Sequence, residues 1–414
     1  MKNILAGLDV LLITNPTNIR YLTGFVGVDA RERESYVLLT KDTVYLFTNS
    51  LYKEAAQKLS NPTNPTNNPM TCVEISREEP FSKKLTEILK RSHLALQGET
   101  LQGIRFGFEE TDLTVAEYNK LKQELKNVML VPTKNRIEEL RMIKRSDEIA
   151  NIRAAAKLTD QCFDFILGKI KRGVTEAEIA WEIESFFRKR GAGLAFSPIV
   201  AFGKNTSQPH YSPNFTRPRL EVEARQGEAL KNNTVILLDF GARVAGYCSD
   251  MTRVVFIGKP KDEWRRAYEV VLEAQQAALE YINCHSGLDP ESSHSQTLDP
   301  GSEAGMTKPL SGAKTDRLAR EVIKKAGLPP CPHSLGHGVG LAIHEIPRLT
   351  ARKDRILPKS QPRKDAILLS DMVFTIEPAV YVEGEYGIRI EDLILLKKDG
   401  IEVLSKSSKT LTIL

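Results

Sequence analysis

Two aspartates in apolar stretches are the first candidates for chemistry in this chain of 414 residues. Asp239 ends the apolar run 235–238, and Asp250 stands just before the β-branched run 252–257. Aspartate is a poor strand former, and its carboxylate is costly to bury without a partner. A turn amide or an arginine could supply that partner, and so could a metal ion. These two residues alone do not decide between an amide, an arginine and a metal.

Four of the seven histidines stand in short, distinctive contexts. One lies in Pro-His-Tyr and three lie in Pro-His-Ser-Leu-Gly-His-Gly-Val-Gly-Leu-Ala-Ile-His-Glu; they are His210, His333, His337 and His344. The Gly-His-Gly-Val-Gly part lacks the full glycine pattern and the preceding strand of a dinucleotide-binding fingerprint. The pair His344-Glu345 lacks the second histidine of a helical zinc-protease motif.

Two glutamates complete the set of residues that are candidates for chemistry. Glu377 lies in Phe-Thr-Ile-Glu-Pro-Ala-Val-Tyr, and Glu391 lies in Gly-Ile-Arg-Ile-Glu-Asp-Leu-Ile-Leu-Leu. Singly, each is explained as a salt-bridged or capping residue. Together with one imidazole and the two aspartates, they place four carboxylates in apolar or glycine-rich sequence. Four buried carboxylates repel one another unless divalent cations compensate them. The predicted ligand set is Asp239, Asp250, His337, Glu377 and Glu391.

The types of these ligands indicate which metal they hold. Oxygen-rich ligation with one histidine favours a hard or borderline ion such as Mn over a thiolate-type zinc site. Five ligands, some of them bridging, suit two ions rather than one. Paired ions roughly 3.5–4 Å apart are typical of hydrolases in which a bridging water becomes the nucleophile. We therefore expect two divalent metal ions, with Mn preferred over Co, Zn or Fe.

A hairpin is needed to bring the two aspartates together. The apolar run before Asp239 predicts a strand, Gly246 predicts a turn, and the run after Asp250 predicts the returning strand. Such a hairpin places both carboxylates in the same region of one sheet face.

The remaining elements predict two domains, 1–135 and 136–414. In the first, strands alternate with helices, which is typical of a small α/β domain; the strands are expected at 8–13, 36–39, 44–48, 104–108 and 128–131, and the helices at 82–92 and from about 112. In the second, four amphipathic helices are expected: from Ser146 as N-cap, from Thr175 with a Glu178 capping box, at about 262–282, and at 315–326. Hairpins between these helices favour an α+β arrangement with the helices on one side of a mostly antiparallel sheet.

Composition narrows the class further. The net charge of +5 is spread over 58 basic and 53 acidic residues, so nucleic-acid binding is not expected. No stretch of 18 apolar residues and no signal peptide is recognised, and the five cysteines form no Cys-x-x-Cys pair, so a reduced cytoplasmic protein without a membrane span is expected. The polar, imperfectly repeated segment 285–307 resembles an insertion in a loop.

The order of five motifs resembles the proline-specific metallopeptidases of the pita-bread (M24, creatinase/prolidase) family, which include Xaa-Pro dipeptidase and aminopeptidase P. The motifs are Asp-Phe-Gly-Ala, Ser-Asp-Met-Thr-Arg, His-Ser-Leu-Gly-His-Gly-Val-Gly, Thr-Ile-Glu-Pro and Arg-Ile-Glu-Asp. Near the N-terminus, Asn-Ile-Arg-Tyr-Leu-Thr-Gly-Phe resembles the start of a creatinase-type domain. The resemblance implies a C-terminal pita-bread catalytic domain, an antiparallel sheet with helices outside, and a smaller α/β creatinase-type N-terminal domain.

The resemblance also implies a role for each ligand. Asp239 would chelate one ion, Asp250 and Glu391 would bridge the two, and His337 with Glu377 would complete the second. Other roles concern the substrate: His210 and His344 would position the peptide and stabilise the tetrahedral intermediate, Glu377 would also pass a proton to the leaving nitrogen, Arg389 would support the site, and His333 would shape the pocket.

The implied reaction is hydrolysis of the Xaa-Pro bond by a metal-bridging hydroxide, which releases the N-terminal residue of a peptide with proline in second position. An Xaa-Pro bond is a tertiary amide without an N–H, so a site that polarises its carbonyl with metal suits it. The family also implies a homodimer. Xaa-Pro dipeptidase is preferred over aminopeptidase P because the chain ends soon after the last motif.

Three further protein classes share parts of this pattern. Methionine aminopeptidase has a similar ligand set but normally lacks the N-terminal domain. Creatinase has both domains but lacks the complete ligand set. An inactive binding module on the same fold is the third, and analysis of bound metal would separate it from an enzyme.

Overall fold

The computed structural model describes residues 4–27, 33–59, 66–91, 101, 103–212, 229–285, 309–351 and 365–414. The chain divides into two compact units, Met1–Arg141 and Met142–Leu414, and the division falls near the end of helix α5 (Glu138–Met142). The expected boundary at 135/136 lies just before this helix. Some residues of interest lie outside the described residues: His93, His294, and most of the loops at 217–232, 285–307 and 349–369.

The N-terminal unit is built on one mixed six-stranded sheet with the order β4-β3-β2-β1-β5-β6. Its strands are β1 (Val10–Ile13), β2 (Ser35–Leu39), β3 (Val44–Thr48), β4 (Met70–Glu74), β5 (Arg105–Glu109) and β6 (Met129–Thr133). Its other helices are α1 (Pro16–Thr23), α2 (Lys53–Gln57), α3 (Phe81–Arg91) and α4 (Val115–Glu124). The predicted hairpin of β2 and β3 is confirmed, since the two strands pair antiparallel. The helix expected from about 112 starts later, because Thr114 caps it in a capping box with Glu117.

The C-terminal unit contains two larger sheets, with the orders β20-β12-β9-β8 and β14-β13-β15-β18-β19. The first sheet consists of β8 (Ile199–Phe202), β9 (Thr234–Phe240), β12 (Met251–Ile257) and β20 (Thr412–Ile413). The second consists of β13 (Gly336–Gly338), β14 (Glu345–Leu349), β15 (Val373–Ile376), β18 (Asp392–Lys397) and β19 (Gly400–Val403). Smaller sheets join β7 (Gly193–Leu194) to β10 (Ala242–Val244) and β11 (Tyr247–Cys248), and β16 (Ala379–Val382) to β17 (Tyr386–Arg389).

The part of this unit that the structure describes contains four long helices, which match the predicted ones in type, with corrections at their starts. They are α6 (Ser146–Leu167), α7 (Glu176–Arg188), α8 (Asp262–His285) and α9 (Gly312–Lys325). The capping box of Thr175 and Glu178 is confirmed. The prediction of Ser146 as an N-cap is wrong by one position: Arg145 is the N-cap, and its backbone N–H donates to the Glu148 carboxylate. Helix α9 starts earlier than expected because the Ser311 hydroxyl caps it.

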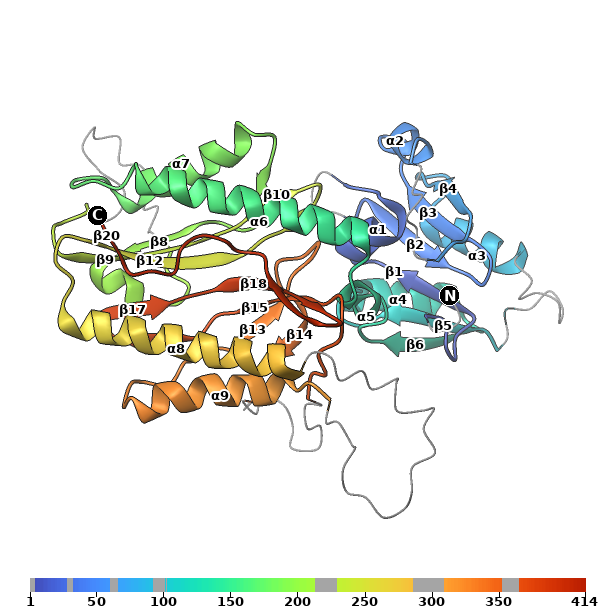
Figure 1. Cartoon of the computed structure of the whole chain (residues 1–414). Helices are drawn as coiled ribbons and strands as arrows, with labels where there is room; N and C mark the ends of the chain where they lie inside the picture. Colours follow the sequence, from blue (N-terminus) through green and yellow to red (C-terminus); the bar gives the residue numbers. More distant parts are fainter. Residues whose placement is uncertain are drawn as a thin grey trace, which may run out of the picture. The chain divides into compact units, whose positions relative to one another are not determined.

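The prediction that these helices cover one side of a sheet is wrong. Figure 1 shows α6 and α7 on one side of the C-terminal unit and α8 and α9 on the other, with the strands between them. The reason lies in β9, whose residues are buried on both faces. Ile236 and Leu238 belong to a core with residues of α6 and α7, whereas Val235 and Leu237 belong to a core with residues of α8 and α9. A strand that is apolar on both faces must be covered on both.

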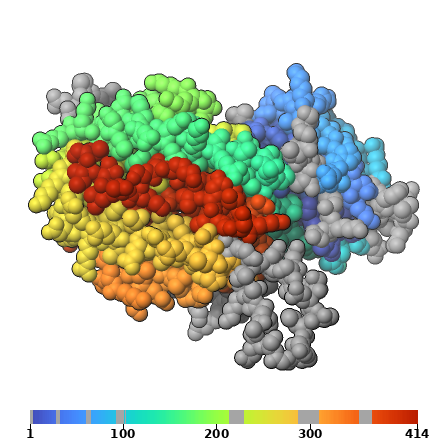
Figure 2. Space-filling view, in the orientation of Figure 1, coloured from blue at the N-terminus to red at the C-terminus, as the bar shows by residue number. Residues whose placement is uncertain are grey.

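The last residues of the chain lie between two of these helices. In Figure 2 the C-terminal segment, in red, runs along the surface between the green α6 and the yellow α8. The Asp160 carboxylate of α6 accepts hydrogen bonds from the backbone of Lys406 and Ser407, and the Tyr268 hydroxyl of α8 donates to the Lys409 carbonyl. Within the described residues, no helix combines the length and apolar character that a membrane span needs.

Candidate metal centre

Strands β9 and β12 carry the two aspartates, and the predicted hairpin is confirmed. The strands pair antiparallel with Asp239 opposite Thr252, so Asp250 lies two residues before the partner of Asp239. Between them, β10 and β11 form the tip of the hairpin, where Ala245 and Gly246 adopt positive φ angles of 48° and 91°. The side chains of both aspartates are buried, because the residues around them fill the cores on either side.

His337 reaches the same place from β13, and its glycine neighbours allow this. A Cβ on Gly336 would lie 1.9 Å from the Thr375 carbonyl oxygen, and one on Gly338 would lie 2.3 Å from the Ile346 carbonyl oxygen. Only glycine therefore permits the neighbouring backbones to approach so closely on both sides. The strand holds the histidine at a fixed depth between its neighbours, and the Thr375 hydroxyl accepts its backbone N–H at 3.2 Å.

The orientation of the His337 ring follows from one hydrogen bond. Nδ1 lies 3.1 Å from the Gly338 carbonyl oxygen, which can only accept, so Nδ1 carries the proton. Burial lowers the pKa of the ring to about 3, which keeps it neutral near pH 7. The lone pair of Nε2 is then free to bind a metal, and it lies 3.6 Å from Asp250 Oδ2 and 3.7 Å from Glu377 Oε1.

The two glutamates come from strand ends that meet these residues. Glu377 directly follows β15, and its backbone N–H donates to the Leu335 carbonyl at 2.8 Å. Glu391 directly precedes β18, and its backbone N–H donates to the Thr252 carbonyl at 3.1 Å. The Thr252 hydroxyl also donates to Glu391 Oε2 at 2.7 Å. The two backbone contacts tie each glutamate to the segment that carries another predicted ligand.

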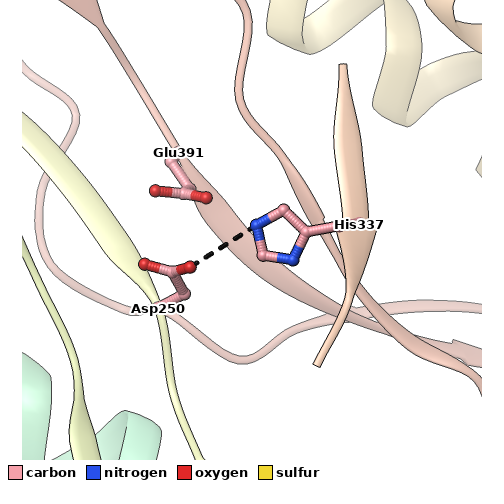
Figure 3. Close-up of side chains that lie close together, drawn as sticks. All are labelled: Asp250, His337 and Glu391. Atoms are coloured by element: carbon pink, nitrogen blue, oxygen red, sulfur yellow. Dashed lines mark ion pairs between the residues drawn. The ribbon is translucent and has the colours of Figure 1, made fainter. Parts of the chain in front are cut away.

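These contacts bring the predicted ligands together. Ligand atoms of Asp250, His337 and Glu391 all lie within 4.8 Å of one another, and Figure 3 shows the three side chains pointing into one space. Asp239 and Glu377 are not part of this tightest group. Asp239 forms an ion pair with Arg389, whereas Glu377 lies beside the His337 ring.

The cluster carries more negative charge than its neighbours neutralise. Burial and the charges of the other carboxylates raise the pKa of Asp250 and of Glu377 well above the ordinary range, and burial raises that of Glu391 to about 7. Two oxygens, Asp239 Oδ1 and Asp250 Oδ1, are buried without a hydrogen-bond partner. Burying such oxygens costs free energy unless a cation occupies the space that they face. The residues therefore fit divalent metal ions.

Arg389 contacts the cluster through Asp239 and Thr252. Its guanidinium is buried, pairs with Asp239 Oδ2, and donates through Nε to the Thr252 hydroxyl at 3.0 Å. Nη1 donates to the Tyr381 hydroxyl at 2.6 Å. Arginine is always protonated, so it holds Asp239 as an anion in a fixed orientation.

Tyr381 and Thr252 also form hydrogen bonds with residues of the candidate site, and neither is predicted from the sequence. The Tyr381 oxygen accepts from Arg389, so its own proton is directed to His333 Nε2, 3.2 Å away. His333 in turn donates from Nδ1 to the Ser334 carbonyl at 2.9 Å, and burial lowers its pKa to about 4. A tyrosine or a threonine inside an apolar strand gives no signal in sequence, because most such residues only pack.

Two of the remaining predicted histidines are exposed, and the third is half-buried. His344 and His210 are both exposed, in contrast to His337. The His344 ring lies edge-on against the His337 ring, with 4.3 Å between the ring centroids. His210 lies within electrostatic reach of the Asp239 carboxyl and the His344 ring. His333 lies beside Glu377, with Nδ1 3.5 Å from Glu377 Oε2.

A buried cluster of carboxylates around a neutral imidazole, on two sheets enclosed by helices, defines the class of protein. Residues 150–398 match the model of metallopeptidase family M24, and residues 5–143 match the creatinase/prolidase N-terminal domain. The chain therefore belongs to metallopeptidase family M24, and its fold is the α+β pita-bread fold preceded by a creatinase-type domain.

Several relatives match the chain over nearly its whole length. The uncharacterized peptidase YqhT of Bacillus subtilis is 31% identical, over 99% of this chain and 96% of its own. The structure of an Xaa-Pro dipeptidase from Bacillus anthracis superposes with a TM-score of 0.76 at 30% identity, covering 100% of this chain and 97% of that one. An X-Pro aminopeptidase from Thermotoga maritima gives a TM-score of 0.74 at 28% identity, covering 99% and 98%.

Proposed function

We propose that this chain hydrolyses the Xaa-Pro peptide bond and releases the N-terminal amino acid, with two divalent metal ions held by Asp239, Asp250, His337, Glu377 and Glu391. The observation that carries the proposal is the surplus of buried negative charge. Two aspartate oxygens in the cluster have no hydrogen-bond partner, and the His337 lone pair is directed at the same space. Carboxylate oxygens with one imidazole favour Mn²⁺ over a thiolate-type zinc site.

The bound ions would polarise the scissile carbonyl and lower the pKa of the attacking water. The protein residues orient the ions and the peptide. Arg389 keeps Asp239 anionic and fixed, and Thr252 fixes Glu391 through its hydroxyl. Because the hydrogen bond of Nδ1 fixes the ring of His337, its Nε2 needs no reorganisation before it binds.

Glu377 is suited to move a proton. Its side chain is 13% exposed, compared with 6% for that of Asp250, so a bound peptide would reach it more readily. A carboxyl at this position would take a proton from the attacking water and pass it to the leaving proline nitrogen. His333, whose ring is neutral and close to Glu377, would shape the pocket around that nitrogen.

The exposed histidines would bind the peptide itself. His344 and His210 are exposed, and their N–H groups would donate to the scissile carbonyl oxygen as it becomes negative. The likeness to an Xaa-Pro dipeptidase and to an X-Pro aminopeptidase supports proline in the second position of the substrate. Of the two activities we favour the dipeptidase, and we also propose that the active form is a homodimer, which light scattering of the purified protein tests.

Cleavage of matched peptides tests the proposal. Metal is removed from the purified protein, Mn²⁺ is added back, and release of the first amino acid is followed from Ala-Pro, Ala-Pro-Ala and Ala-Ala. We expect metal-dependent cleavage of Ala-Pro and none of Ala-Ala. Cleavage of Ala-Pro-Ala in preference to Ala-Pro would assign aminopeptidase P instead. If neither proline peptide is cleaved with Mn²⁺ bound, the proposal is wrong.

A further inference from the structure

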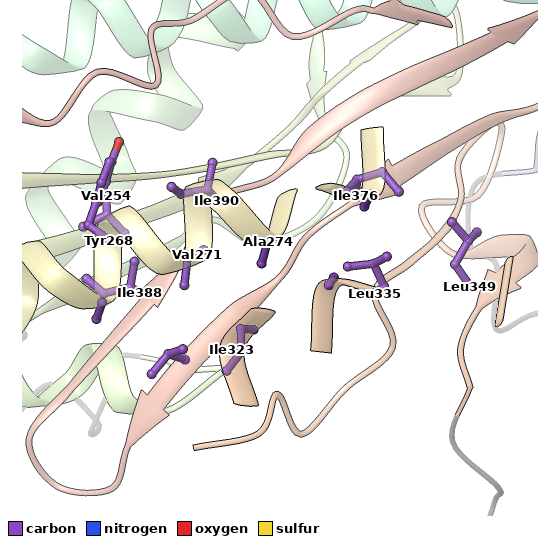
Figure 4. Packing of buried hydrophobic residues seen from close by; sticks show 14 of the residues in the cluster. Val254, Tyr268, Val271, Ala274, Ile323, Leu335, Leu349, Ile376, Ile388 and Ile390 are labelled. Atoms are coloured by element: carbon purple, nitrogen blue, oxygen red, sulfur yellow. The ribbon is translucent and has the colours of Figure 1, made fainter. Parts of the chain in front are cut away.

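An amide side chain lies in the apolar contact between helix α8 and the strands that carry the two glutamates. Gln275 has no exposed surface, and its neighbours Val271, Ala274 and Ala278 are core residues of the same helix. Val271 and Ala274 belong to the same core cluster as Ile376 and Ile390, which precede the two glutamates, and Figure 4 shows all four in that cluster. A polar group in such a core is costly unless each of its donors and acceptors is satisfied.

Both ends of the Gln275 amide form hydrogen bonds, and their partners allow only one orientation of the amide. Its nitrogen Nε2 donates to the carbonyl oxygen of Ile376 at 3.1 Å and to that of Ile390 at 3.3 Å. Its oxygen Oε1 accepts from Lys409 Nζ at 2.9 Å. Carbonyls only accept and a lysine ammonium only donates, so these partners fix which end of the amide faces the strands.

These two carbonyls belong to the peptide groups that directly precede the two glutamates of the predicted ligand set. The Ile376–Glu377 peptide is held at its carbonyl by Gln275 and at its N–H by the Leu335 carbonyl. The Ile390–Glu391 peptide is held at its carbonyl by the same nitrogen and at its N–H by the Thr252 carbonyl. The orientation of a peptide group sets the direction in which the next side chain leaves the backbone.

The residues whose carbonyls accept the N–H groups of Glu377 and Glu391 lie close in sequence to two other predicted ligands. Leu335 lies two residues before His337, and Thr252 lies two residues after Asp250. One nitrogen atom of Gln275 thus connects the segments that carry four of the five predicted ligands.

We propose that Gln275 is a positioning residue that sets the separation of Glu377 and Glu391, and thereby the binding of the second divalent ion. The inference rests on the two-ion site of the proposed function. Without the amide, the two strand ends would lose their shared donor, and the glutamates could move apart. Outer hydrogen-bond partners of metal ligands typically change metal affinity by ~10–100-fold.

Lys409 extends this network to the C-terminal segment. Its ammonium donates to the Gln275 oxygen and to Asp392 Oδ2, at 2.9 and 2.6 Å. The other Asp392 oxygen pairs with the buried Arg253, which also binds the carbonyl of Ser407. The C-terminal segment therefore holds the amide in its orientation, and a substitution of Lys409 tests the same inference without placing a new side chain in the core.

The test is a titration of metal-free protein with Mn²⁺, with the free ion followed by electron paramagnetic resonance. The variants are Gln275→Met, which removes all three hydrogen bonds, and Gln275→Glu, which keeps an acceptor for Lys409 but offers the two carbonyls no amide donor. Gln276→Met on the exposed side of the same helix is the matched control. We expect the wild-type and control proteins to bind two ions, and both Gln275 variants to bind the second ion ~10–100-fold more weakly. Their first ion should bind with unchanged affinity.

A merely structural role would lower the melting temperature and leave the affinity for the second ion unchanged, and that result would overturn the inference. If both Gln275 variants fail to fold, Lys409→Met decides by the same titration. Wild-type protein that binds two ions but cleaves no Xaa-Pro peptide would contradict the proposed function alone, and the titration would still decide the role of Gln275. Wild-type protein that binds fewer than two ions would overturn both.

Discussion

Two buried glutamates in this protein have pKa values raised to the same level but different hydrogen-bond partners. Burial raises the pKa of Glu109, in the N-terminal unit, to about 7, and it raises the pKa of Glu391, in the C-terminal unit, to the same value. Glu109 accepts hydrogen bonds from the backbone N–H groups of Thr14 and Asn15 and from the Asn18 amide, at 2.6 to 2.7 Å. It holds the start of helix α1 against β5.

Glu391 has three other carboxylates around it instead of such backbone and amide donors. The charges of Glu391, Asp239 and Glu377 all raise the pKa of Asp250, and oxygens of Asp239 and Asp250 lack hydrogen-bond partners. A raised pKa therefore does not by itself mark a functional site. What distinguishes the two regions is whether the chain supplies the donors that a buried carboxylate needs, or leaves that role to an ion from outside.

The largest expected effect separates activity from stability. Asp250→Asn removes one carboxylate from the cluster and one ligand from the metals, so kcat/KM for Ala-Pro should fall by ~10³-fold or more. The metal-free variant should nevertheless be more stable than metal-free wild type, because the burial and the neighbouring carboxylates that raise the pKa of Asp250 no longer act on an ionisable group there. Glu109→Gln should do the opposite, with lower stability and unchanged metal binding. Peptide cleavage and thermal unfolding measure both effects; a metal-free Asp250→Asn protein less stable than wild type would contradict this account.

Replacement of Arg389 should lower the stability of the metal-free protein more than that of the metal-loaded protein. Arg389→Met leaves the buried Asp239 carboxylate without its cation, and removing one partner of a buried ion pair typically costs about 3–5 kcal/mol. Bound divalent ions should recover part of this loss, since they supply the missing positive charge. Urea unfolding of the variant with and without Mn²⁺ measures it, with Arg389→Lys as the control that keeps the charge. An equal loss in both conditions would show that the metals do not lie beside Asp239.

The dependence of stability on pH should differ between the two regions. An acid whose pKa is raised on folding contributes stability that is present below its ordinary pKa and is lost as pH rises through the folded value. In metal-free protein, Glu109 and Glu391 should therefore contribute a loss of stability between about pH 5 and pH 8. Below about pH 6.5, the buried rings of His333 and His337 should oppose this loss, because their pKa values are lowered on folding. Bound metal should remove the part due to Glu391, because ligation requires the carboxylate form.

The part of the pH dependence of stability that is due to Glu109 should remain in the metal-loaded protein and disappear in Glu109→Gln. Calorimetric unfolding at the two pH values, with and without Mn²⁺, checks this difference. A pH dependence that metal leaves unchanged would assign the whole effect to the N-terminal unit.

The smallest effect should come from Tyr381→Phe. This change removes the acceptor of Arg389 and the donor to His333 but keeps every predicted ligand. Loss of one hydrogen bond to a charged group costs about 1.5 kcal/mol, which is a factor of ~10 in kcat/KM. The number of bound ions should stay the same. A loss as large as that of Asp250→Asn would mean that Tyr381 contacts the reacting peptide directly.

Local signals in the sequence were sufficient for much of the fold. The capping box at Thr175 and the hairpin of β2 and β3 depend on residues close in sequence, and both were predicted. The two-sided placement of the helices was not, although the apolar run 235–238 has no polar alternation and thus indicates a strand buried on both faces. Ser146 is a residue type typical of an N-cap, but the helix begins one residue earlier because Glu148 reaches back to Arg145.

In the candidate site too, some residues could be predicted from the sequence and others could not. Carboxylates and histidines in apolar sequence are conspicuous, because such residues need a reason to be there, and the structure gathers the predicted ones around one space. Tyr381, Thr252 and Gln275 act through contacts with residues far away in the chain. Their residue types are ordinary in strands and helices, so only the folded structure reveals what they hold in place.

Activity measured against the number of bound ions tests the central claim most directly. Metal-free protein would be titrated with Mn²⁺, and the rate of Ala-Pro cleavage would be recorded with the metal content of the same samples. We expect no cleavage without metal and a rate that rises until two ions are bound per chain, then levels off. Full activity of protein freed of metal, or two bound ions without cleavage, would contradict a two-ion Xaa-Pro peptidase.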